Sequence, residues 1–145
     1  MEILLRCPHC GEAVPASPVL PALRCSAEVY ALLGPALVRR RQERFLVVGL
    51  DSRNRVIRRH LVAVGSLGAV VVHPREVFAP LLRDRAAAAI LVHNHPSGDP
   101  TPSGEDLELT RRLVEAGRLL GIPVLDHLVV GRDGYSSLLD LGALS

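Results

Sequence analysis

Two histidines and an aspartate lie close together in the chain, at a spacing that suits a metal ion. His93 and His95 are two residues apart at the end of an apolar run, so the pleat of a strand places both imidazoles on one face. Asp106 follows in the first turn of an expected helix. Two imidazoles and one carboxylate leave a fourth tetrahedral position for water, which is typical of a catalytic zinc site. We therefore expect one catalytic Zn²⁺ at this position.

The segment between the histidines and the aspartate carries signals of a tight return loop. Ser103 is predicted to be the N-cap of the next helix, and Asp106 occupies the capping-box position with Asp in place of Glu. This geometry directs Asp106 back toward the end of the strand. Three prolines and a glycine restrict the path of the loop: Pro96, Gly98, Pro100 and Pro102.

Hydrolysis at such a site also requires a carboxylate that takes and returns a proton from water. Two glutamates are candidates on residue type and placement. Glu43 directly precedes an expected strand, so it lies at a sheet end, whereas Glu76 lies in an expected helix. The residues alone leave both candidates open.

The elements that must position these side chains follow from hydrophobic periodicity and turn signals. An alternation of strand-like and helix-like segments predicts an α/β fold of the α+β type, with a mixed, mostly antiparallel sheet flanked by helices. One expected helix begins at the N-cap Ser26 and has a break or kink at Pro35. A second begins at Pro74 and continues over Arg75 to Arg83, and a third begins after Ser103 and ends near Gly121. The expected strands cover 45–50, 56–64, 68–72, the second half of 86–92, 124–130 and 135–139.

The first 25 residues differ in composition from the rest of the chain. Cys7 and Cys10 form a Cys-x-x-Cys pair, Cys25 follows fifteen residues later, and prolines are frequent between them. The pair is half of a zinc ribbon, so Cys7, Cys10 and Cys25 are candidate ligands of a second, structural zinc ion. A vestigial or reducible thiol pair is an equal alternative. We accordingly divide the chain into an appendage, 1–25, and a main domain, 26–145.

Composition excludes several classes of function. The chain has 145 residues, enough for one ordinary domain, and its longest apolar run, from Ala86 to Val92, is far shorter than a membrane helix. The net charge is +2, Trp is absent and only two Tyr and two Phe occur, which disfavours nucleic-acid binding by field or by base stacking. Three cysteines and no leader sequence indicate a reducing cytoplasm.

The pattern His-x-His, seven residues, Ser, two residues, Asp resembles the metal-binding signature of the JAB/MPN (JAMM) metallopeptidases. The flanking segments, Val72 to Phe78 and Val124 to Gly131, are similar to the bacterial RadC branch. The resemblance implies a JAB/MPN cytidine-deaminase-like architecture, with His93, His95 and Asp106 as zinc ligands. It further implies that Ser103 stabilises the tetrahedral intermediate and that Glu43, rather than Glu76, is the general base.

The leading hypothesis is therefore a cytoplasmic zinc hydrolase acting on a peptide or an isopeptide-linked protein. RadC proteins usually carry a helical, DNA-binding-like segment before this domain, and here the Cys7/Cys10 appendage stands in its place. The alternative hypothesis is a non-catalytic RadC-like module in DNA repair or processing that binds partners or DNA. No membrane partner is expected, and an exposed sheet edge could support a homodimer.

Asp126 and His127 are adjacent polar residues within an otherwise apolar strand. Neighbouring strand positions face opposite sides of a sheet, so only one of the two can reach the expected metal site. Either residue could orient a zinc-bound histidine from behind. The alternative is a satisfied polar pair in a buried strand.

Overall fold

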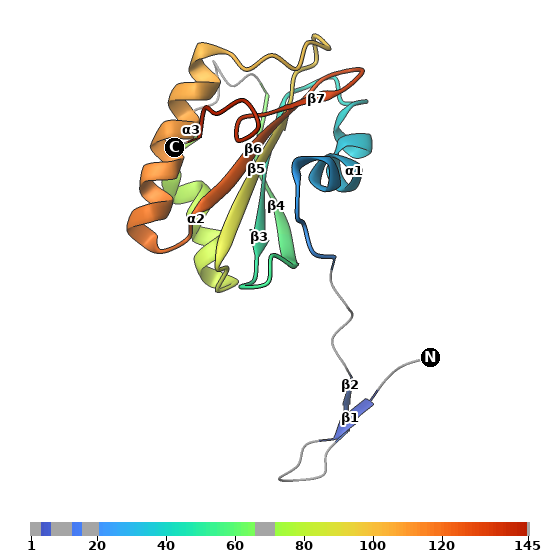
Figure 1. Ribbon diagram of the computed structural model, residues 1–145, viewed down its shortest axis with the longest axis vertical. Coiled ribbons are helices and arrows are strands. Elements are labelled where there is room, and N and C mark those ends of the chain that lie inside the picture. The colour runs from blue at the N-terminus through green and yellow to red at the C-terminus, as the bar shows by residue number, and fades with distance from the viewer. Residues whose placement is uncertain (1–3, 7–12, 16–20, 66–71, 145) are drawn as a thin grey trace.

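The computed structural model describes residues 4–6, 13–15, 21–65 and 72–144. Its main element is a five-stranded sheet, mixed and mostly antiparallel, in which only β5 and β6 run parallel (Figure 1). The strands, in spatial order, are β4 (Val56–Val64), β3 (Arg44–Leu50), β5 (Ala88–Asn94), β6 (Val124–Val130) and β7 (Tyr135–Ser137). The predicted fold class is confirmed.

In the described ranges, three helices cover the two faces of this sheet. They are α1 (Ser26–Leu37), α2 (Pro74–Arg83) and α3 (Gly104–Leu120). The helix α1 packs on one face, and α2 and α3 pack on the other (Figure 1). A separate pair of short antiparallel strands, β1 (Leu4–Arg6) and β2 (Ala13–Pro15), precedes them. None of the helices in the described ranges is both long and apolar enough to cross a lipid bilayer.

The central strand β5 explains the apolar run that precedes the histidines. All seven of its residues are buried, because helices cover the sheet on both sides. Ile90 and Val92 pack in the α1 core, whereas Ala89 and Leu91 pack against α2 and α3. A strand buried on both faces reads as a continuous apolar stretch rather than as an alternation.

The helix α1 corrects two predictions made from the sequence. It continues through Pro35 to Leu37 without a break, because the missing N–H of Pro35 removes a single hydrogen bond to the preceding turn. The N-cap is Cys25, and the hydroxyl of Ser26 instead donates to Asp140 Oδ2 at 2.6 Å.

The remaining elements agree with the sequence analysis within a few residues. The strand β7 ends at Ser137, two residues earlier than predicted, and Gly121 closes α3 in the left-handed conformation. The strand predicted over 68–72 lies outside the described residues except for its last position. Leu23 is 6% exposed and belongs to the α1 core, so packing extends slightly upstream of residue 26.

Candidate metal centre

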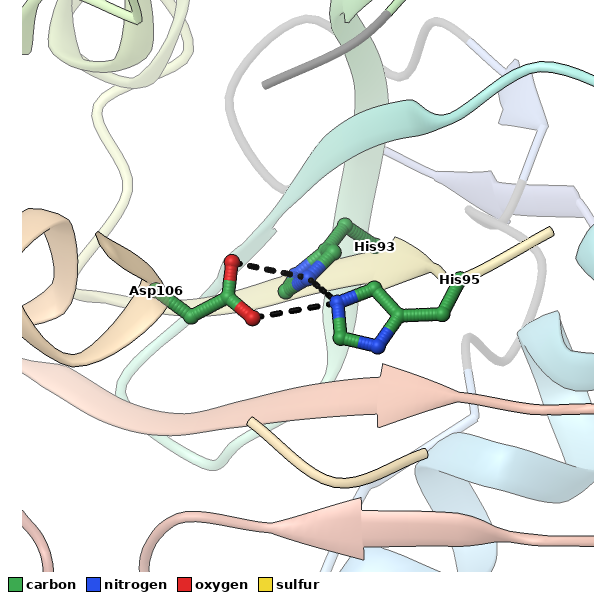
Figure 2. Close-up of side chains that lie close together, drawn as sticks. All are labelled: His93, His95 and Asp106. Atoms are coloured by element: carbon green, nitrogen blue, oxygen red, sulfur yellow. Dashed lines mark hydrogen bonds and ion pairs between the residues drawn. The ribbon is translucent and has the colours of Figure 1, made fainter. Parts of the chain in front are cut away.

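Three candidate ligands meet at one end of the sheet, between β5 and α3. His93 is the second-to-last residue of β5, His95 directly follows this strand, and Asp106 is in the first turn of α3. One ligand atom from each lies within 4.8 Å of the others, so this cluster could hold a metal ion (Figure 2). His93 and Asp106 are almost fully buried, and the side chain of His95 is 14% exposed. Solvent therefore reaches the cluster at the side chain of His95.

The separations within the cluster fit a tetrahedral ion. The two Nε2 atoms of His93 and His95 are 3.1 Å apart. The carboxylate of Asp106 reaches His93 Nε2 at 3.3 Å and His95 Nε2 at 3.0 Å. A tetrahedral zinc ion with bonds of about 2.0–2.1 Å holds its ligand atoms about 3.3 Å apart. The cluster needs little rearrangement to take such an ion.

The other ring nitrogen of His95, Nδ1, is already hydrogen-bonded. His95 Nδ1 lies 2.9 Å from the carbonyl oxygen of Asp99, which can only accept a hydrogen bond. Nδ1 therefore carries the proton, and Nε2 presents its lone pair to the cluster. This is the tautomer that a metal-binding histidine needs when Nε2 is the ligand atom.

A hydrogen-bonded chain fixes His93 in the same way. The hydroxyl of Thr110 donates to the carbonyl oxygen of Asp106 at 2.6 Å, so it must accept from His127 Nδ1, also at 2.6 Å. Burial is the main cause that lowers the pKa of His127 well below 6.5, and electrostatic repulsion from His93 lowers it further. The ring of His127 is therefore neutral. Its Nε2 then accepts from His93 Nδ1 at 2.7 Å. His93 Nε2 is thus left facing Asp106 and His95.

Asp106 is held in its ionised form by the same surroundings. Burial acts to raise the pKa of Asp106, yet interaction with His93 and hydrogen bonds from Ser103 outweigh it and keep that pKa well below the usual range. Ser103 N donates to Asp106 Oδ2 at 2.8 Å, and Asp106 N donates to Ser103 Oγ at 3.1 Å. This reciprocal pair is the predicted capping box.

The loop between the histidines and α3 is anchored to the end of β6. Gly98 has a φ of +94°, and its carbonyl oxygen accepts from Arg132 N at 2.9 Å. A Cβ at Gly131 would lie 2.4 Å from that carbonyl oxygen, so only glycine permits this approach. The close contact holds the loop, and with it Asp99, beside the metal ligands.

The two glutamates proposed as the base occupy different environments. Glu43 is half-buried, and the peptide groups on both sides of it are bound by Asn94: Arg44 N donates to Asn94 Oδ1 at 2.7 Å, and Asn94 Nδ2 donates to the carbonyl of Gln42 at 3.1 Å. Glu76 lies in the first turn of α2 with its side chain 63% exposed. The assignment of the base stays a prediction.

Asp126 and His127 separate as strand geometry requires. His127 contacts a candidate ligand, as described above, whereas Asp126 lies on the opposite face of β6. Asp126 accepts from Ser137 Oγ and His127 N, both at 2.7 Å, and from Leu139 N at 3.1 Å. Of the predicted structural zinc ligands, Cys7 and Cys10 lie outside the described residues, and Cys25 is a free, exposed thiol.

Two residues of the site, Thr110 and Asn94, were not anticipated from the sequence. Thr110 follows Asp106 by four positions, so on a helix both side chains share one face. Asn94 lies between the two histidines and therefore points to the opposite side of the pleat. These spacings are visible in the sequence, but the partners of both residues come from distant segments.

Comparison with known proteins agrees with the family resemblance found in the sequence. The family of RadC-like JAB domains matches residues 23–143. A UPF0758 protein of Syntrophotalea carbinolica is 53% identical over 116 residues, which cover 80% of this chain and 51% of that protein. A UPF0758 protein of Symbiobacterium thermophilum is 49% identical over 138 residues, or 94% of this chain and 59% of that protein. The chain thus spans about half the length of the curated relatives it matches.

Proposed function

We propose, on the premise that this chain belongs to the RadC-like JAB domain family, that it is a zinc-dependent hydrolase of peptide or isopeptide bonds. One observation carries the proposal. The Nε2 atoms of two histidines and a buried carboxylate converge, while both Nδ1 atoms are committed to acceptors elsewhere. Such a set of groups is complete only when a metal ion or an extra proton lies between them.

Zinc is the ion that best suits this donor set. Two imidazoles and one carboxylate are the ligands of many catalytic zinc sites, in which a fourth position stays open. Zinc bound by His93, His95 and Asp106 would supply an acidified water and polarise a carbonyl group. The small exposed part of the His95 side chain marks the side from which solvent and substrate would reach the site.

Glu43 is the group that we propose to move the proton. Its backbone is held on both sides by Asn94, the residue between His93 and His95. The carbonyl oxygen of Glu43 also accepts from Gly65 N at 2.8 Å. These bonds support a fixed position for Glu43 at the end of β3, from which it would take a proton from the attacking water and return it to the leaving amine.

Ser103 is suited to the developing negative charge on the scissile carbonyl. Its Oγ already accepts from Asp106 N, which leaves the hydroxyl proton to be donated. No acceptor for that proton is found in the described part of the chain. Because Ser103 is the N-cap of α3, the positive end of the α3 dipole would also stabilise this negative charge.

The experiment that tests this proposal compares zinc-loaded wild type with Glu43→Gln and Glu76→Gln on a mixture of peptides and isopeptide-linked peptides, with products identified by mass spectrometry. The proposal expects cleavage by wild type and by Glu76→Gln. Glu43→Gln should keep its zinc and lose cleavage. Cleavage by Glu43→Gln at the wild-type rate would remove Glu43 from the mechanism. A zinc-loaded wild type that cuts none of the peptides would favour the non-catalytic alternative.

A further inference from the structure

A groove lies on the α1 face of the sheet, next to the edge strand β4. The helix α1 packs mainly over β5 and β6 and also covers Val48 and Leu50 of β3, so the β4 side of this face is the more exposed part. The groove has a volume of about 180 Å³ and is floored by Leu37, Leu46 and Leu61. Leu61 is 51% exposed, which is high for a leucine on a sheet face. The groove therefore offers apolar surface to a partner.

Three arginines surround this apolar floor. Arg40 comes from the end of α1, Arg44 from β3 and Arg59 from β4. No acidic residue lines the groove, and none of these arginines forms an ion pair within the described residues. Four other arginines of the described residues, Arg55, Arg58, Arg75 and Arg111, do form ion pairs. The groove thus concentrates positive charge that the chain itself does not neutralise.

The groove also begins next to the candidate metal centre. Arg44 directly follows Glu43, and its backbone N–H is bound by the side chain of Asn94. Its neighbour Phe45 is the register partner of His93. The sheet end that carries the groove is therefore the same end that carries the metal ligands, on the opposite face.

The composition of the groove distinguishes between two kinds of anionic partner. Arginines bind carboxylates and phosphates alike. A nucleic acid, however, would leave the three leucines without apolar contacts, and no aromatic side chain lines the groove to stack on a base. A peptide that carries both carboxylates and aliphatic side chains can pair with the arginines of the rim and pack on the leucines of the floor. In the described residues β4 pairs as a strand only with β3. Apart from Val56 N, which donates to the carbonyl oxygen of Pro21 at 2.9 Å, its outer edge presents backbone groups to an extended peptide.

We propose that this groove binds an acidic segment of the protein substrate, in which Asp or Glu side chains flank leucine or isoleucine. Naming the occupant a substrate rests on the proposed function. The binding itself requires neither metal nor catalysis, so it is measured separately.

The test is fluorescence anisotropy with labelled peptides and the full-length Glu43→Gln variant, which cannot consume the peptide if the proposed mechanism holds. The probe is a peptide of alternating Glu and Leu, and the comparison peptides replace Glu with Lys or Leu with Ser. We expect binding of the Glu/Leu peptide, none of the Lys peptide, and about fivefold weaker binding of the Ser peptide. A DNA duplex of equal charge should bind more weakly than the Glu/Leu peptide.

Matched variants locate the binding surface. In the same Glu43→Gln background, Arg40→Glu/Arg59→Glu should weaken peptide binding at least about tenfold. Leu61→Ser, which replaces an exposed leucine, should weaken peptide binding about fivefold. Arg83→Glu/Arg112→Glu alters the net charge equally on other helices and should change the affinity less than about twofold.

Three results would overturn the proposal. One is tighter binding of the DNA duplex than of the peptide, lost in Arg40→Glu/Arg59→Glu, which would make the groove a nucleic-acid site. Another is an equal loss in both double variants, which would reduce binding to general charge attraction. The third is no peptide binding at all. Peptide binding by Glu43→Gln, together with a zinc-loaded wild type that cleaves no peptide, would uphold the groove and refute only the catalytic proposal.

Discussion

Both faces of the sheet carry buried polar side chains, but the hydrogen bonding of these side chains differs between the two faces. On the α1 face, Asn94 and Asp126 are surrounded by donors and acceptors of the backbone and of Ser137. On the α3 face, two Nε2 atoms and a carboxylate point at one another, and His93 and His95 can share at most one proton across the 3.1 Å between them.

This difference separates a structural role from a ligand-binding role. A buried polar group that serves the fold has its hydrogen bonds completed by the chain. The cluster of His93, His95 and Asp106 is completed only by a cation or an extra proton. Residues of the first kind should therefore control stability, and residues of the second kind should control metal affinity.

The largest effect is expected at Asp106, on the α3 face. Asp106→Asn keeps an oxygen for the capping box but removes the charged ligand, so zinc affinity should fall on the order of a thousandfold. This is about a quarter to two fifths of the binding free energy of about 10–16 kcal/mol seen in protein zinc sites. The stability of the metal-free chain should change by less than about 1 kcal/mol. Competition with a chromogenic chelator and urea unfolding measure the two quantities. A large loss of metal-free stability would mean that Asp106 is mainly structural.

The reverse is expected at Asp126, on the α1 face. Asp126→Ala leaves the buried hydroxyl of Ser137 and the backbone N–H of His127 without acceptors, which should cost about 3 kcal/mol in the free energy of unfolding. Zinc content should stay at the wild-type level. Urea denaturation and elemental analysis of the same preparation check this, and loss of zinc from a folded Asp126→Ala would break the distinction between the faces.

Thr110 provides an intermediate case, because it acts on the ligands through His127. Thr110→Val removes the acceptor for His127 Nδ1–H, which allows the other tautomer and disturbs His93. Zinc affinity should fall about 10–100-fold. Thr110→Ser keeps the hydroxyl and should restore it.

Nitrogen-15 NMR of the histidine rings reports the tautomers directly. We expect the metal-free wild type and Thr110→Ser to share one pattern for His127, and Thr110→Val to differ. An unchanged pattern in Thr110→Val would mean that the hydroxyl does not select the tautomer.

Asn94 should affect the position of Glu43 more than the metal. Asn94→Ala removes the two hydrogen bonds to the backbone of Gln42 and Arg44, which should cost about 1–2 kcal/mol of stability and leave zinc affinity within about threefold. Hydrogen exchange at the Arg44 amide should become faster. Slow exchange at this amide in Asn94→Ala would show that the segment is held by other contacts.

The smallest effect concerns a carboxylate outside both faces. A backbone hydrogen bond from Arg55, with others from Arg53 and the Arg55 side chain, lowers the pKa of the half-buried Asp51 below its usual 3.8. Because the folded state lowers this pKa, Asp51 stabilises the fold above pH 3.8, and the contribution is lost as the pH falls through the lowered value. The stability difference between wild type and Asp51→Asn should be constant near neutral pH and shrink below pH 3.8 in urea unfolding. A difference that grows in acid would contradict this sign.

Local patterns explain what the sequence predicted well. The alternation of a strand places His93 and His95 together, and the capping box places Asp106 beside them, so the candidate ligands follow from short spacings. The overall sheet follows from periodicity. Of the break or kink expected at Pro35, the break was wrong, because the rest of the helix compensates for the one hydrogen bond that Pro35 cannot make.

Long-range register explains what the sequence left open. Either Asp126 or His127 could face the ligands, and the choice depends on pairing between β5 and β6, where an irregularity at Ala89 and Ile90 shifts the register. The contact of Asn94 with Arg44 likewise joins residues fifty positions apart. No local pattern contains either of these contacts.

The central claim is that His93, His95 and Asp106 bind one zinc ion, and elemental analysis tests it most directly. Wild type and His95→Ala are both loaded with zinc, freed of excess metal by gel filtration, and compared. The account predicts that wild type holds one zinc ion more per chain than His95→Ala, with Cys7→Ser/Cys10→Ser keeping that ion. Equal zinc content in wild type and His95→Ala would contradict it.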